Sequence, residues 1–424
     1  FICMLDASVE HLSLREVEKI HVFAISHGFA LDVVLGTSFI NMYGKCGSFK
    51  DAQGVFDTFL VRDPIAWNAM LSAQVQSGEG AQTYQIFTRM LLECVLPCRA
   101  TFASSLSAFV IQEMIGEGKR LHTHVIGSKF KADIVLGNTL VNMYGKCGYF
   151  NEAEKIFKEL PEGDVVSWNA LIAAYAQRKH EDKAWGLMEQ MQVEGILPDK
   201  VTFISILDVC VTDASLTKGK LMHCCIISNH FDMDTFIGSA IVSMYGKCGS
   251  LCDAEEAFNH MPRQTTVSWN AFLATFSQHG KAKQTIRYFD RMKQEVVPDK
   301  VTFIILLTAC SHAGLVDEAC DFFSSMLQTY NLIPSIDHYA CMIDLLGRAG
   351  RLQEAENLLK RAPCRHNAVL YKTLLGACMQ QSDVERGENA AKAAFHLDRH
   401  DPTPYIMLRN LYSVAERGSD IAML

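Results

Sequence analysis

The sequence predicts an all-α fold class, a solenoid in which helix–turn–helix units stack on one another around a continuous core. The first observation is a strict period, because the hexapeptide Met-Tyr-Gly-Lys-Cys-Gly recurs every 101 residues, at Met42–Gly47, Met143–Gly148 and Met244–Gly249. The second is length, since the 424 residues exceed the roughly 250–300 at which one globular core stops growing. The third is an apolar content of 49%, enough for burial along an array. Together they indicate units that pack on their neighbours.

The segment Val165–Asp199 shows what one unit contains. Apolar side chains at i, i+3, i+4 and i+7 indicate a first helix, at Trp168, Leu171, Ile172 and Tyr175. The same spacing indicates a second helix, at Ala184, Leu187, Met188 and Met191. Gly195 and Pro198 then end the second helix. Such a unit cannot bury both apolar faces alone, so it must stack.

Each step of 101 residues divides into three units of 31, 35 and 35 residues, here Ile134–Asp164, Val165–Asp199 and Lys200–Asp234. The next unit, Thr235–Thr265, has 31 residues again. Trp-Asn pairs keep the same step, at Trp67, Trp168 and Trp269, and so do His21, His122 and His223. We expect the tryptophans to lie in the core and the histidines to be packing or surface residues.

Composition excludes several classes of function. A net charge of −8 opposes a simple electrostatic nucleic-acid binder, so any such function must depend on base contacts and a locally basic groove. The sequence has no apolar run long enough to span a membrane. The fifteen cysteines include no Cys-x-x-Cys, and we expect reduced, small, buried side chains without a metal or other cofactor. The chain begins at Phe1 without a targeting pattern, so we expect that its start is truncated and that any targeting segment lies outside this sequence.

The units resemble the pentatricopeptide repeat family. A 34-residue tetratricopeptide array is the nearest rival, but its Trp-x-x-Leu-Gly signature is missing. The unit lengths and the motifs Val-Ser-Trp-Asn-Ala, Leu-Pro-Asp-Lys-Val-Thr-Phe and Met-Tyr-Gly-Lys-Cys-Gly are similar to the plant PLS subclass, in which standard (P), long (L) and short (S) repeats alternate. The resemblance implies a right-handed, tetratricopeptide-like α-α superhelix that binds single-stranded RNA in a mitochondrion or chloroplast.

The resemblance also implies a register for the whole chain. The repeats are L 1–32, S 33–63, P 64–98, L 99–133, S 134–164, P 165–199, L 200–234, S 235–265, P 266–299, L 300–335 and S 336–367. The 266–299 repeat is one residue shorter than its equivalents. Residues 368–424 resemble a truncated form of the E-type extension found in RNA-editing members, and could contact a deaminase-bearing or accessory protein.

In this family the fifth residue of a repeat, in the first helix, pairs with the last residue to recognise one base. Three pairs have the uridine combination, namely Asn138/Asp164, Asn169/Asp199 and Asn270/Asp299. The pair Thr37/Asp63 has the guanine combination, and Asn68/Cys98 keeps a pyrimidine-leaning Asn without its Asp. Two pairs are non-standard, Ser239/Thr265 and Ala340/Asn367. The long repeats have Ile2, Ala103, Ile204 and Ile304 at the fifth position, which cannot hydrogen-bond a base edge.

Two further sets of residues are candidates for RNA contact. Apolar side chains at the second position of the repeats would flank the bases, at Val34, Ile65, Val135, Val166, Phe236 and Val267. Basic residues end the first helix of each short repeat, at Lys45, Lys146, Lys247 and Arg348. These basic residues either lie near phosphates or only complement the negative end of the helix dipole.

The sequence favours a binding module over an enzyme. Zinc-dependent base deamination needs a His-x-Glu and a Cys-x-x-Cys, and neither occurs in the chain. The leading hypothesis is a site-recognition factor for C-to-U RNA editing that positions or recruits a deaminase, without a membrane or a small-molecule substrate. The alternatives are an RNA-binding factor for transcript stabilisation, processing or translation, and a protein-binding helical-repeat scaffold.

Overall fold

The computed structural model describes residues 14–28, 33–77, 80–111, 114–161, 163–212, 215–399 and 401–415. Within these ranges the chain forms twenty-four α-helices and no strand, which confirms the all-α solenoid class. The predicted fifth-position residue Ile2 and the last nine residues of the predicted extension lie outside the described residues. None of the described helices has the length and hydrophobicity needed to cross a membrane.

The chain divides into two compact units, Phe1–Thr212 and Asp213–Leu424, and clusters of buried apolar residues lie in both. The first unit contains α2 (Leu14–Ser26), α3 (Val33–Lys45), α4 (Phe49–Asp57), α5 (Pro64–Ser77), α6 (Gly80–Leu92), α7 (Arg99–Ile111), α8 (Ile115–Ile126), α9 (Ile134–Lys146), α10 (Phe150–Glu159), α11 (Val165–Gln177), α12 (Glu181–Val193) and α13 (Lys200–Thr212).

The second unit contains α14 (Leu216–Ser228), α15 (Thr235–Lys247), α16 (Leu251–His260), α17 (Thr266–Gln278), α18 (Ala282–Glu295), α19 (Lys300–Ala313), α20 (Val316–Gln328), α21 (Ile336–Arg348), α22 (Leu352–Arg361), α23 (Ala368–Gln381), α24 (Val384–Leu397) and α25 (Thr403–Val414). The boundary between the units falls within the expected long repeat 200–234, between α13 and α14.

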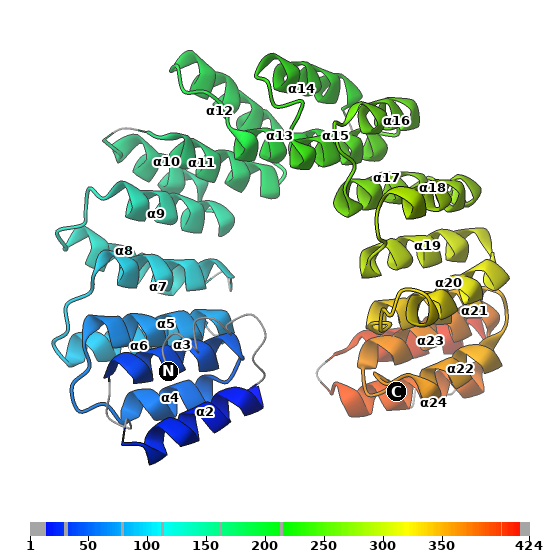
Figure 1. The fold of residues 1–424 in the computed structure, drawn as a ribbon, viewed down its shortest axis with the longest axis horizontal. Helices are drawn as coiled ribbons and strands as arrows, with labels where there is room; N and C mark the ends of the chain where they lie inside the picture. The colour runs from blue at the N-terminus through cyan, green and yellow to red at the C-terminus, as the bar shows by residue number, and fades with distance from the viewer. Residues whose placement is uncertain are drawn as a thin grey trace. The chain divides into compact units, whose positions relative to one another are not determined.

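Within each unit the helices form two layers (Figure 1). First helices of successive pairs pack side by side, as α7, α9, α11 and α13 do in the first unit and α15, α17, α19 and α21 do in the second. A second helix within a unit packs against its own first helix and the next one, as α10 does against α9 and α11. The residues in the first turn of one first helix therefore lie beside the start of the next first helix.

The recurring hexapeptide is a packing element. A Cβ on its first glycine would overlap the next first helix, since at Gly44 it would lie 2.6 Å from the Cβ of Ala73. The equivalent glycines Gly145 and Gly246 face Ala174 and Thr275 in the same way. The second glycine ends the helix in the left-handed region, with φ of +73° at Gly47. The first glycine therefore sets how closely successive first helices approach.

The histidine and tyrosine that share the period join a second helix to the first helix that follows it. The Nδ1 atom of His122 lies 3.0 Å from the hydroxyl of Tyr144, and the His21–Tyr43 and His223–Tyr245 pairs have the same bond. Burial lowers the pKa of His122 and raises the pKa of Tyr144 to about 12. The pair is therefore neutral near pH 7 and acts as a packing contact.

The recurring tryptophans lie in the core. Trp67, Trp168 and Trp269 are at most 1% exposed, and each ring packs edge-on against a phenylalanine of the preceding second helix. The cysteines in the described ranges are free thiols, and no His, Cys, Asp or Glu cluster there could hold a metal ion.

Candidate nucleic-acid interface

The predicted fifth-position residues lie one turn into the first helices, beside the residue that precedes the next first helix. Asn138 on α9 faces Asp164, which caps α11, because α9 and α11 pack side by side. The Nδ2 of Asn138 donates to Oδ1 of Asp164 at 3.2 Å. The same bond joins Asn169 to Asp199 at 2.9 Å and Asn270 to Asp299 at 3.0 Å.

A hydroxyl completes each of these sites. Ser167 Oγ donates to Oδ1 of Asn138 at 2.6 Å. Thr202 donates to Asn169 at 2.6 Å, and Thr302 donates to Asn270 at 2.7 Å. These hydroxyls are not among the site residues predicted from the sequence. Their signal is a Ser or Thr three positions after each pairing Asp, within the Val-Ser-Trp-Asn and Asp-Lys-Val-Thr motifs.

The aspartates have a second role as helix caps. Oδ1 of Asp164 accepts from the backbone N–H of Ser167 at 2.8 Å, and Oδ1 of Asp299 accepts from that of Thr302 at 2.9 Å. Burial alone would raise the pKa of Asp164, but hydrogen bonds from Ser167 and Asn138 outweigh it and lower that pKa. An ionised carboxylate only accepts, so it turns the NH₂ of the Asn toward itself. The asparagine amides are therefore held in one orientation.

An oriented amide keeps one N–H and one carbonyl lone pair for a ligand. The three asparagines are 7–8% exposed, so only a small part of each residue is open to a ligand. One donor beside one acceptor can bind a base edge that presents an acceptor beside a donor, as uracil does with O4 and N3–H.

The pair Asn68/Cys98 has the same architecture with sulfur in place of the carboxylate. Asn68 Nδ2 donates to Cys98 Sγ at 3.3 Å, and Thr101 Oγ1 donates to Asn68 Oδ1 at 2.7 Å. Burial raises the pKa of the Cys98 thiol, but hydrogen bonds from Thr101, Asn68 and Ala100 give a net lowering. A thiol is a weaker acceptor than a carboxylate, so this amide is held less firmly.

The structure does not join the remaining predicted pairs by a hydrogen bond within the described ranges. Thr37 Oγ1 donates to Val33 O at 2.6 Å, and Asp63 Oδ1 accepts from Ala66 N at 2.8 Å. Likewise, Ser239 donates to Thr235 O, while Thr265 and Asn367 cap α17 and α23. Ala340 is half-buried. The physical reason is local. The short hydroxyl side chains of Thr37 and Ser239 donate to carbonyls of their own helices, and none of the three pairs has a fifth-position amide that reaches the capping residue.

The second-position apolar side chains form an exposed row beside these sites. Their exposed fractions run from 45% to 67%, for Val34, Ile65, Val135, Val166, Phe236 and Val267. Three exposed residues that were not predicted stand at the same position, the second residue of α13, α19 and α23, namely Val201, Val301 and Val369. Side chains of this type on most first helices can flank successive ligand groups within each unit; α7 has Ala100 and α21 has Asp337 at this position.

The four predicted basic residues stand at the C-terminal ends of their helices. Lys45, Lys146 and Lys247 are the last residues of α3, α9 and α15, and Arg348 is the last residue of α21. Arg348 Nε is 2.8 Å from Asp344, so part of its charge is paired. Lysines at these positions complement the helix dipole and also lie on the first-helix layer, so both of the predicted roles remain compatible with the structure.

Comparison with known proteins gives consistent results. The sequence matches the PPR repeat family over residues 163–212 and 264–312, and the PPR repeat over 37–62, 138–165, 301–328 and 337–365. A mitochondrial pentatricopeptide repeat-containing protein of Arabidopsis thaliana is 33% identical over 99% of this chain and 67% of its own length. Another mitochondrial one is 36% identical over 96% of this chain and 48% of its own length. The chain thus spans about half to two thirds of these relatives.

Solved structures resemble this fold. The pentatricopeptide repeat protein PPR10 in complex with an 18-nucleotide psaJ RNA element has a TM-score of 0.61 and 20% identity, over 92% of this chain and 59% of that one. PPR10 from maize has a TM-score of 0.55 and 18% identity, over 99% of this chain and 67% of that one. At this identity the likeness concerns the helical-repeat architecture alone.

Proposed function

This chain belongs to the PPR repeat family, and from that premise we propose that it binds single-stranded RNA through the exposed edges of its oriented asparagines. The observation that carries the proposal is the repeated site of Asn, Asp and hydroxyl at Asn138, Asn169 and Asn270. An amide held by two partners binds a base without losing further side-chain freedom. Preorganisation of this kind favours affinity and selectivity.

Each site would bind one splayed base. The free N–H of the Asn donates to O4 of uracil, and its carbonyl accepts from N3–H. A good two-bond contact contributes about 1–3 kcal/mol of discrimination against a wrong base. The flanking Val, Ile and Phe side chains add apolar contact, and contact with Val or Ile is weaker than the ~1–3 kcal/mol of aromatic stacking.

In the proposed target only some positions are selective for a base. In order, the positions are G, a pyrimidine, any base, U, U, any base, a weakly selected base and U. The guanine position rests on Thr37 and Asp63, which present acceptors because the Thr37 hydroxyl donates to its own helix. Guanine presents two donors, N1–H and N2–H, on its Watson–Crick edge, so two acceptors fit it. The long-repeat residues Ala103, Ile204 and Ile304 offer neither donor nor acceptor and serve as spacers.

We further propose that the chain selects sites for C-to-U editing in an organelle. Helices α23, α24 and α25 pack on one another, and α23 also packs on α21, so residues 368–415 extend the array without a break in packing. In this proposal the RNA lies 5′ of the target cytidine, and residues 368–424 contact a deaminase-bearing or accessory protein. The mitochondrial relatives support an organellar location, either mitochondrion or chloroplast.

The test is a binding titration with purified protein. An RNA of sequence G-Y-N-U-U-N-N-U is compared with the same RNA carrying A at the three U positions, at several salt concentrations. We expect at least tenfold weaker binding of the second RNA. Equal affinities would contradict base recognition, and absence of any RNA binding would favour a protein-binding scaffold. Organellar editing with and without the gene separates the editing role from transcript stabilisation, processing or translation.

A further inference from the structure

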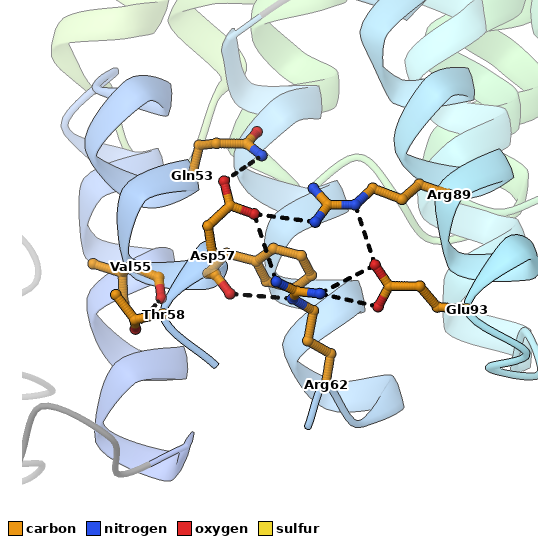
Figure 2. Close-up of polar contacts among 8 residues, drawn as sticks. Gln53, Val55, Asp57, Thr58, Arg62, Arg89 and Glu93 are labelled. Atoms are coloured by element: carbon orange, nitrogen blue, oxygen red, sulfur yellow. Dashed lines mark hydrogen bonds and ion pairs between the residues drawn. The ribbon is translucent and has the colours of Figure 1, made fainter. Parts of the chain in front are cut away.

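A network of charged side chains joins α4 to α6 in the first unit. Figure 2 shows Arg62 between Asp57 on α4 and Glu93 just after α6. The Arg62 guanidinium lies 5.0 Å from the ring centroid of Phe56 and donates to Phe56 O at 3.3 Å. Its Nη1 lies 3.1 Å from both oxygens of Glu93. An aromatic face, a carbonyl and two carboxylates, Glu93 and at 3.7 Å Asp57, therefore bind one guanidinium.

The equivalent place 202 residues later is also filled by the chain itself. Gln264 stands where Arg62 does, and its Nε2 donates to Phe258 O at 3.3 Å. Arg291 stands where Arg89 does and lies 5.3 Å from the ring centroid of Trp269. Its Nε donates to Glu295, the equivalent of Glu93, at 3.1 Å.

The middle repetition keeps the aromatic ring and one carboxylate, at Phe157 and Glu194, and has no arginine. Lys158 stands where Asp57 does and lies 3.8 Å from Glu154. Gly163 stands where Arg62 and Gln264 do, and Gln190 stands where the sequence elsewhere has Arg89 and Arg291. A cavity of about 500 Å³ lies here, and Gly163, Phe157, Trp168, Gln190 and Glu194 contribute to its lining. A Cβ at residue 163 would lie 3.5 Å from Trp168 Nε1 and 3.8 Å from the Phe157 ring. A side chain at this position would therefore extend into the cavity.

Glu194 gives the cavity an acceptor for a cation with several N–H donors. Glu194 Oε1 accepts from Gln190 Nε2 at 2.9 Å, and in the described ranges its Oε2 accepts no hydrogen bond. Trp168 Nε1 is buried without a hydrogen-bond partner among the described residues, as are Trp67 Nε1 and Trp269 Nε1. Its N–H only donates, so it does not bind a cation, but Trp168 lines the cavity and can report on it. Three carboxylates and two ammonium groups line the cavity, namely Glu154, Asp182, Glu194, Lys158 and Lys183.

We propose that this cavity binds an arginine side chain of a partner protein. The guanidinium takes the place of the side chain of Arg62, stacks on Phe157 and donates to Phe157 O and Glu194. A lysine fits less well, because its ammonium neither stacks on a ring face nor donates in a planar fork. The cavity lies among α10, α12 and the start of α11, so this site is separate from the Asn–Asp bonds.

The test uses the whole chain with ¹⁵N-labelled tryptophan and N-acetyl-L-argininamide as the probe. We expect a saturable shift of the Trp168 indole N–H signal at millimolar probe, identified by its loss in Trp168→Phe. We also expect at least tenfold weaker binding of N-acetyl-L-lysinamide. Gly163→Arg should abolish the shift by filling the cavity, and Glu194→Gln should weaken binding about tenfold.

Three results would each overturn the proposal: no saturable shift, equal binding of the lysine probe, or an unchanged titration in Gly163→Arg. The signals of Trp67 and Trp269 report whether each variant is folded. RNA affinity is a separate readout, and we expect Gly163→Arg to bind the target RNA within twofold of the wild type. Failure of arginine binding therefore leaves RNA recognition untouched, and the reverse also holds.

Discussion

The Asn169 and Asn68 sites have the same construction and differ in one acceptor. Both have an Asn one turn into the first helix and a threonine hydroxyl donating to its Oδ1, Thr202 in one and Thr101 in the other. The third group is the carboxylate of Asp199 at 2.9 Å in one site and the thiol of Cys98 at 3.3 Å in the other. The amide stays in place at both sites, so the hydroxyl and helix packing position it, while the carboxylate makes its orientation firm.

The largest effect should follow from removing an amide altogether. Asn169→Ala removes the donor and acceptor proposed to bind uracil, so we expect RNA binding to weaken by about 1–3 kcal/mol. A filter-binding titration against the proposed target measures this loss. Asn151→Ala, an exposed position on α10, is the matched control and should bind as the wild type does. A loss of the same size in both variants would argue against a direct base contact.

Removing the hydroxyl should have a smaller effect. Thr202→Val keeps the shape of a buried side chain but deletes its hydrogen bond to Asn169, so the amide can turn over. We expect the preference for U over A at this position to fall by ~1 kcal/mol, the usual contribution of one hydrogen bond. Competition between two RNAs that differ only there measures it. Thr123→Val, at an exposed site on α8, should leave the preference unchanged.

Exchanging the acceptor tests the comparison directly. Cys98→Asp should convert the looser site into a copy of the Asn169 site and raise the pyrimidine preference at that position by up to about 1 kcal/mol, because bonds to a charged acceptor are stronger. Asp199→Cys should have the opposite effect on the other site. Selectivity profiling with randomised RNA measures both. If neither exchange moves selectivity, the acceptor has no part in orienting the amide.

The smallest effect concerns stability at acid pH. Hydrogen bonds lower the pKa of Asp164, so this group stabilises the fold above the usual Asp pKa, and its contribution is lost as pH falls through the lowered value. Asp164→Asn keeps a good helix cap but removes the charge, so its unfolding temperature should vary less between pH 5 and pH 2. Thermal unfolding followed by circular dichroism measures this. Parallel curves for the two proteins would show that the Asp164 charge does not contribute.

Much of the fold could be predicted because its signals are local. The spacing of Trp168, Leu171 and Tyr175 indicates a helix within one unit, and the period shows that units repeat. The partners Asn138 and Asp164 were predicted from the register of the repeats. Ser167 was not, because a serine at the start of a helix has an ordinary role as a polar residue, and only packing of α9 against α11 brings its hydroxyl to Asn138.

By itself the sequence determined the helices, their register and the residues placed at each register position, since hydrophobic period and capping residues act within one unit. Tertiary structure decided which of those residues meet. It joins Asn169 to Asp199 and Thr202, leaves Thr37 bonded to its own helix, and opens a cavity where Gly163 replaces an arginine. The physical reason is that a hydrogen bond or a cavity depends on side chains from two or three packed helices, whose approach is set by contacts such as Gly44 on Ala73.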